Sequence, residues 1–130
     1  MEREKLRYLI ESAEMIAADI TVQKAEYYKV KEAVTFCREW LDGFSVDDYL
    51  IFELLDDEEE DDLVGYYVGA TTEHVKLMLG IILGVFSCVA VAVLDENKTP
   101  VPQYLEGIDK EYYEAVWRDV QKYYGLTNKH

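Results

Sequence analysis

Hydrophobic side chains recur at spacings of three and four residues along the first part of the chain. This spacing predicts an amphipathic helix from about Arg3 to Ile20. A second, antiparallel helix is expected from about Val22 to Asp42, because the pattern continues and Gly43 can adopt the left-handed conformation that often ends a helix. The apolar positions are Leu6, Leu9, Ile10, Ala13, Ile16, Ala17 and Ile20 in the first helix, and Tyr28, Val30, Ala33, Val34, Cys37, Trp40 and Leu41 in the second.

A third helix is predicted to begin after Ser45. The Ser45 hydroxyl is a plausible N-cap, and Asp47 and Asp48 would lie in the first turn, where the helix dipole favours negative charge. The helix is expected to end in a run of acidic residues. Its apolar side is predicted to carry Val46, Tyr49, Leu50, Phe52 and Leu55.

An uncharged apolar segment extends from Leu77 to Leu94 and includes a GxxxG motif at Gly80 and Gly84. Its eighteen residues are at the lower limit for a membrane span, which stays open as an alternative. The flanking residues lack the basic cluster and aromatic belt of typical anchors. The preferred interpretation is therefore the central helix of a bundle, in which the glycines let neighbouring elements approach closely.

The last part of the chain predicts an irregular connection followed by a final helix. Pro100 and Pro102 disfavour helix at and just before themselves. Asp109 is a suitable N-cap for a helix to about Tyr124, with Gly125 as its stop. Together the patterns predict an all-α protein: one domain over residues 1–130, folded as a bundle of about five or six helices around a central apolar helix.

Composition agrees with a globular chain, since half of the 130 residues are hydrophobic. Cys37 and Cys88 lie in apolar helical patterns and belong to no CxxC or Cys/His motif, which favours buried thiols over a disulfide. The first fifteen residues contain no uninterrupted apolar stretch typical of a secretory signal, so a cytoplasmic location is expected.

Charge is the most unusual property of the chain. It has 27 acidic and 13 basic residues, a formal net charge of −14. Residues 47–62, called here the acidic segment, contain ten carboxylates and no base. Such a field repels phosphate backbones, so direct nucleic-acid binding is not expected, and it attracts basic protein surfaces. A merely solvated, solubilising charge run is an equally open interpretation.

Residues typical of catalysis are sparse. The two histidines are His74 and His130, and the nucleophile, metalloprotease and phosphate-binding motifs are missing from the sequence. Glu73 and His74 are adjacent, and neighbours on a helix point in different directions. The acidic segment lacks the glycine and the spacing of an EF-hand loop. We therefore expect no enzyme activity, no cofactor and no specific metal site.

Tyrosines point towards protein recognition. Eight of the eleven occur in adjacent pairs, at 27–28, 66–67, 112–113 and 123–124. One member of each pair should be exposed or at the core boundary, where tyrosine often supplies binding energy. Tyrosines that flank the acidic segment would give a surface that is both aromatic and anionic. The predicted partner-binding residues are Tyr49, Glu53, Asp56, Asp57, Glu58, Glu59, Glu60, Asp61, Asp62, Tyr66 and Tyr67.

Several motifs resemble a known family. They are AVTFCREWLDG (Ala33–Gly43), the acidic segment, the long apolar helix and PVPQYLEGI (Pro100–Ile108) before the final helix. This arrangement resembles the all-helical immunity proteins of bacterial polymorphic toxin systems, most closely the sixth family in that numbering. The resemblance implies a cytoplasmic antitoxin that binds and blocks a cognate toxin domain, with no catalytic residues of its own.

The charge of the chain extends this hypothesis to a basic toxin domain, for example a nuclease. Two alternatives stay open: a nucleic-acid mimic that inhibits a DNA-binding protein, and a small protein anchored in a membrane by residues 77–94. The sequence does not indicate an oligomeric state.

Overall fold

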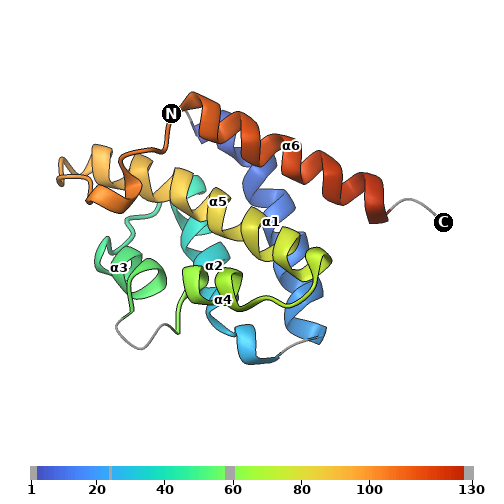
Figure 1. The fold of residues 1–130 in the computed structure, drawn as a ribbon. Helices are drawn as coiled ribbons and strands as arrows, with labels where there is room; N and C mark the ends of the chain where they lie inside the picture. Colours follow the sequence, from blue (N-terminus) through green and yellow to red (C-terminus); the bar gives the residue numbers. More distant parts are fainter. Residues whose placement is uncertain (1–2, 24, 58–60, 128–130) are drawn as a thin grey trace.

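The computed structural model describes residues 3–23, 25–57 and 61–127, and within these ranges the protein is all-α, as predicted (Figure 1). Six α-helices and two 3-10 helices are present there, and no strand. In chain order they are α1 (Arg3–Gln23), η1 (Ala25–Tyr27), α2 (Lys29–Leu41), α3 (Tyr49–Leu55), α4 (Leu63–Gly69), α5 (Glu73–Glu96), η2 (Gln103–Leu105) and α6 (Lys110–Thr127).

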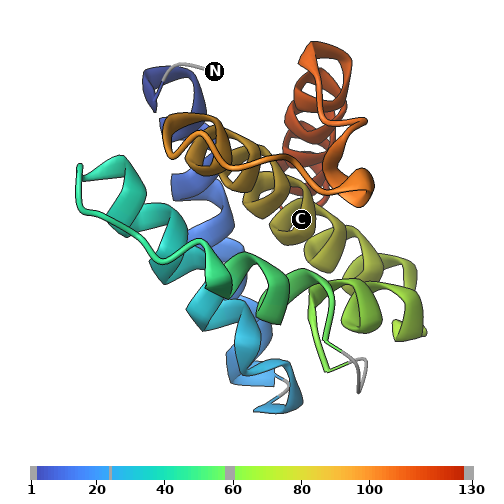
Figure 2. The ribbon, with the colours of Figure 1, turned by 90° about the vertical axis from the view of Figure 1, so that its left-hand side faces the viewer.

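Helix α5 is the centre of the fold, because α1, α2, α4 and α6 all pack against it (Figures 1 and 2). Among the described helices it is also the one long and apolar enough to cross a membrane, judged by length and composition. Within the fold, 78% of its most apolar stretch is buried. The prediction of a central apolar helix is confirmed, and the apolar surface of α5 is explained by its contacts with the surrounding helices.

The two glycines of α5 lie where other elements come close. A Cβ atom at Gly84 would lie 2.6 Å from Cγ2 of Val116 on α6, well inside normal contact distance. A Cβ atom at Gly80 would lie 3.0 Å from the ring of Tyr67 on α4. The absence of side chains at these two positions therefore allows both neighbours to pack on α5.

Two predicted helix starts are wrong. Val22 belongs to the end of α1, and α2 begins only at Lys29, after the 3-10 turn. Helix α3 begins at Tyr49 rather than just after Ser45, because the Asp47 carboxylate accepts a hydrogen bond from the Tyr49 backbone N–H at 3.0 Å and forms a turn before the helix. Three side chains predicted to lie on the apolar sides of these helices are exposed: Tyr28 by 52%, Tyr49 by 62% and Phe52 by 37%.

Other predicted helix ends and caps agree more closely with the structure. Gly43 follows α2 with a φ of +90°, and Asp109 caps α6 by accepting a hydrogen bond from the Tyr112 backbone N–H at 3.0 Å, both as predicted. Gly125 does not end α6, which continues to Thr127; the Thr127 hydroxyl donates to the Tyr123 carbonyl at 3.1 Å. Cys37 and Cys88 are buried free thiols, as expected.

Candidate functional site

The acidic segment presents part of its charge on the outer side of α3. Tyr49 and Glu53 lie one turn apart on α3 and Asp56 directly follows the helix; all three are exposed, Tyr49 by 62%. The opposite side of this short helix is buried through Ile51 and Leu54. The requirement to bury these two apolar side chains therefore fixes which carboxylates face solvent.

Glu53 and Asp56 are available to a partner. Within the described parts of the chain, neither side chain forms a hydrogen bond or an ion pair with another residue. A basic group from another protein can pair with either carboxylate without first displacing any of the described residues. This distinguishes the two from most other described carboxylates of the acidic segment.

Lys29 forms ion pairs with two carboxylates of the acidic segment. Its Nζ lies 2.8 Å from Oδ2 of Asp57 and 3.7 Å from Oδ2 of Asp61, and it also donates to the Asp61 carbonyl. The side chain of Lys29 is only 14% exposed. Burial alone would lower the pKa of Lys29, but the hydrogen bond to Asp57 and the two negative charges outweigh it and raise that pKa.

Asp61 has further partners within the fold. Its carboxylate accepts hydrogen bonds from the hydroxyls of Tyr28 and Tyr66, the second at 2.8 Å. These two bonds, aided by Lys29, lower the pKa of the Asp61 carboxyl. Burial and the contact with Asp61 raise the pKa of Tyr66, whose ring centroid lies 5.1 Å from that of Tyr27. Asp61 thus joins Tyr28 and the start of α2 to α4.

The carboxylate of Asp62 accepts hydrogen bonds from backbone N–H groups. It is 4% exposed and caps α4, with Oδ1 accepting from the Gly65 N–H at 2.7 Å and Oδ2 from the Asp57 N–H at 2.8 Å. Both carboxylate oxygens are therefore already used inside the protein.

The structure thus divides the predicted contact residues into four groups. The first group is exposed on α3 or directly after it: Tyr49, Glu53 and Asp56. The second, Asp57 and Asp61, is paired with Lys29, and the third, Asp62, Tyr66 and Tyr67, contacts the protein's own helices. The fourth, Glu58, Glu59 and Glu60, lies outside the described residues.

Tyr104 on η2 is a neighbour of this site that the sequence analysis missed. It is 45% exposed, and its pKa is raised by partial burial and by the nearby negative charge of Asp56. The connection before η2 is attached to the start of α3, since Asp48 Oδ2 accepts a hydrogen bond from the Thr99 hydroxyl at 3.1 Å. No local sequence signal links Tyr104 to Asp56, because only the tertiary fold brings them together.

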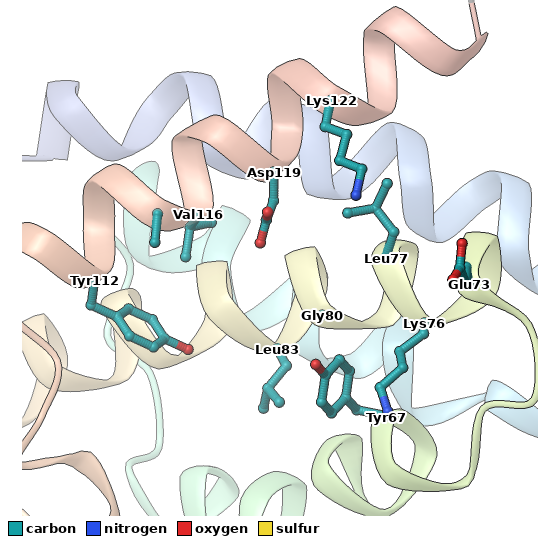
Figure 3. Close-up of a pocket in the computed structure, with 11 residues that line it drawn as sticks. Tyr67, Glu73, Lys76, Leu77, Gly80, Leu83, Tyr112, Val116, Asp119 and Lys122 are labelled. Atoms are coloured by element: carbon teal, nitrogen blue, oxygen red, sulfur yellow. The ribbon is translucent and has the colours of Figure 1, made fainter.

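A separate groove of about 510 Å³ lies between α4, α5 and α6 (Figure 3). Leu77, Gly80 and Leu83 of α5 contribute to its lining, and the ring of Tyr67 lies beside Gly80. Two acids and two bases also line it, so its charge selects neither cations nor anions. These four charged residues are Glu73, Lys76, Asp119 and Lys122.

The groove holds no recognisable catalytic arrangement among the described residues. Glu73 and His74 are not hydrogen-bonded to each other, and the ring of His74 stacks on that of Tyr123 at a centroid distance of 6.0 Å. Across the described ranges, no group of three or more His, Cys, Asp or Glu side chains is arranged to hold a metal ion.

Comparison with known proteins gives one result. The family model described as "Immunity protein Imm6" matches residues 4–124, nearly the whole chain. Neither the curated proteins nor the solved structures contain a match.

Proposed function

We propose, on the premise that the chain belongs to the Imm6 family of immunity proteins, that it is a cytoplasmic antitoxin which binds one cognate toxin domain and blocks it. The proposal assigns no chemical step to this chain. Inhibition would follow from occupation of the toxin's surface, which requires shape and charge complementarity rather than catalytic groups.

The observation that supports this proposal is the presence of two exposed carboxylates, one on α3 and one directly after it. Glu53 and Asp56 are exposed and lack an internal partner within the described residues, while the chain as a whole has a net charge of −14. Such a surface attracts a basic toxin domain over a distance of about 10 Å at moderate salt and accelerates encounter. The proposed partner is therefore basic.

A nuclease domain is one kind of basic toxin domain that fits this surface. Nucleases bind a phosphate backbone through lysine and arginine, and carboxylates on an inhibitor can pair with the same side chains. An immunity protein with an acidic face would then exclude nucleic acid by occupying the basic surface of the toxin.

The function can be tested by an affinity pull-down with this protein from its native host, at low and then high salt, which identifies a candidate toxin domain. The domain is expressed in a bacterial host with and without this protein, and complex formation is measured at low and high salt. We expect restored growth and a complex whose formation slows as salt rises. A host that is killed equally in both cases, together with no detectable complex, would contradict the proposal.

A further inference from the structure

Exposed aromatic side chains gather next to the unpaired carboxylates. Tyr49 and Phe52 lie one turn apart on α3 and are 62% and 37% exposed, and Tyr104 on η2 is 45% exposed. We call the five residues Tyr49, Phe52, Glu53, Asp56 and Tyr104 the α3–η2 surface. Large aromatic groups left in contact with water are the residue type that most often supplies binding energy at interfaces.

The two segments of this surface are held in a fixed relation. Asp48, directly before α3, accepts hydrogen bonds from the Thr99 hydroxyl at 3.1 Å and from the Asn97 amide at 3.5 Å. At the other end of α3, Leu55 is buried in the same core as Leu105, the neighbour of Tyr104 on η2. Partial burial and the negative charge of Asp56 both raise the pKa of Tyr104. A partner that binds here therefore meets a preorganised surface and loses little free energy in ordering it.

Charge decides which kind of partner fits. In a symmetric dimer formed through this surface, Glu53 and Asp56 of one copy would come close to the same residues of the other. Two chains that each carry a net charge of −14 would also repel one another. A basic surface from a different protein relieves both costs, because its cations can pair with carboxylates that have no internal partner among the described residues.

We infer that the α3–η2 surface is the docking site for the toxin domain, with Tyr49 and Tyr104 as anchors that enter an apolar recess lined at its rim by basic side chains. Glu53 and Asp56 pair with those basic side chains. The inference rests on the proposed immunity function and adds to it the anchors, one of which lies outside the acidic segment.

The two kinds of residue should affect different rate constants. Truncation of an anchor removes contacts made only in the complex, so Tyr49→Ala and Tyr104→Ala should each raise the dissociation rate about tenfold or more. Neutralisation of a carboxylate in Glu53→Gln or Asp56→Asn should mainly lower the association rate, with an effect that fades at high salt. Trp117→Ala on α6, where the side chain is 44% exposed, is the matched aromatic control and should leave both rates unchanged.

The experiment measures both rates for these variants by surface plasmon resonance, with the toxin domain recovered in the affinity pull-down immobilised. In parallel, hydrogen exchange of the unmutated protein is followed with and without that domain. We expect faster dissociation of both tyrosine variants and slower exchange on binding in residues 49–56 and 103–105.

The possible outcomes distinguish a wrong docking site from a failure of the proposed immunity function. If the unmutated protein binds the toxin domain and protects the host while both tyrosine variants dissociate at its rate, the docking site is wrong and the immunity function stands. Unchanged exchange at both segments in the complex would overturn the inference without reliance on any variant. If the unmutated protein neither binds nor protects, the proposed function itself fails.

Discussion

The ammonium group of Lys29 lies 2.8 Å from a carboxylate oxygen of Asp57, and this ion pair joins the start of α2 to the acidic segment. With Asp61 as a second partner at 3.7 Å, Lys29 contacts two of the carboxylates in a segment that has no basic residue of its own. Two described carboxylates of the acidic segment are therefore held by a cation from another helix.

Replacement of this cation should cost stability. Lys29→Met retains most of the aliphatic stem and leaves two carboxylates close together without their cation, so we expect the free energy of unfolding to fall by about 1–2 kcal/mol. Urea unfolding at low salt measures the loss. Lys31→Met, at an exposed position on α2, is the control and should be close to neutral. Equal stabilities for the two variants would contradict this account of Lys29.

Asp62 is predicted to stabilise the fold rather than contact a partner. In Asp62→Ala the Gly65 and Asp57 N–H groups both lose their acceptor, and the expected loss is about 1–3 kcal/mol. Asp62→Asn keeps one carbonyl oxygen and should retain part of that stability. Thermal unfolding compares the two. A stable alanine variant that binds the toxin domain more slowly would instead place Asp62 in the interface.

Gly84 should tolerate a side chain poorly. In Gly84→Ala the new Cβ would lie 2.6 Å from the Val116 side chain, and the resulting displacement of α6 should cost about 1–3 kcal/mol. Gly125→Ala is the control, because nothing lies within 4 Å of a Cβ there and alanine favours the helix. Chemical denaturation should show a loss for the first variant and a small gain for the second; two gains would mean that α5 and α6 are not packed through Gly84.

The Asp61 carboxyl should make stability depend on acidic pH. Its hydrogen bonds from Tyr28 and Tyr66 lower its pKa in the folded protein, so the folded state binds this proton more weakly than the unfolded chain. The stabilisation is present above the ordinary pKa range of a carboxyl and is lost as the pH falls through the lower, folded value. In Tyr28→Phe the slope of unfolding free energy against pH should be shallower below about pH 5. Tyr49→Phe serves as the control, and identical slopes for all three proteins would exclude this role of Asp61.

The long helices could be predicted from the sequence, and the short ones only in part. The repeats in α1 and α6 and the uncharged run in α5 are strong signals over many residues. Helix α4 was not predicted, since LVGYYVG contains two glycines and is too short to show a period. Its cap, Asp62, carries no sequence signal of that role, because it is one of ten carboxylates in the acidic segment.

The sequence could predict the candidate site only where the local spacing of residues determines which side chains are exposed. Glu53 on α3 and Asp56 directly after it are exposed, as a contact surface requires. Tyr49 is also exposed, although the apolar pattern predicts it on the buried side of the helix. The pairing of Lys29 with Asp57 and the position of Tyr104 near Asp56 depend on tertiary packing, which the spacing of residues along the chain does not encode. A charge count alone therefore overstates how much of the acidic segment is available to a partner.

The central claim is that Glu53 on α3 and Asp56 directly after it bind the toxin, and one measurement tests it most directly. The association rate of the toxin domain is measured at low salt for the double variant Glu53→Lys with Asp56→Lys. The same rate is measured for Glu11→Lys with Glu114→Lys, which changes net charge equally at exposed positions on α1 and α6. We predict a loss of about tenfold or more for the α3 variant and a much smaller loss for the control. Equal losses would contradict the claim, since they would mean that only the overall charge of the protein matters.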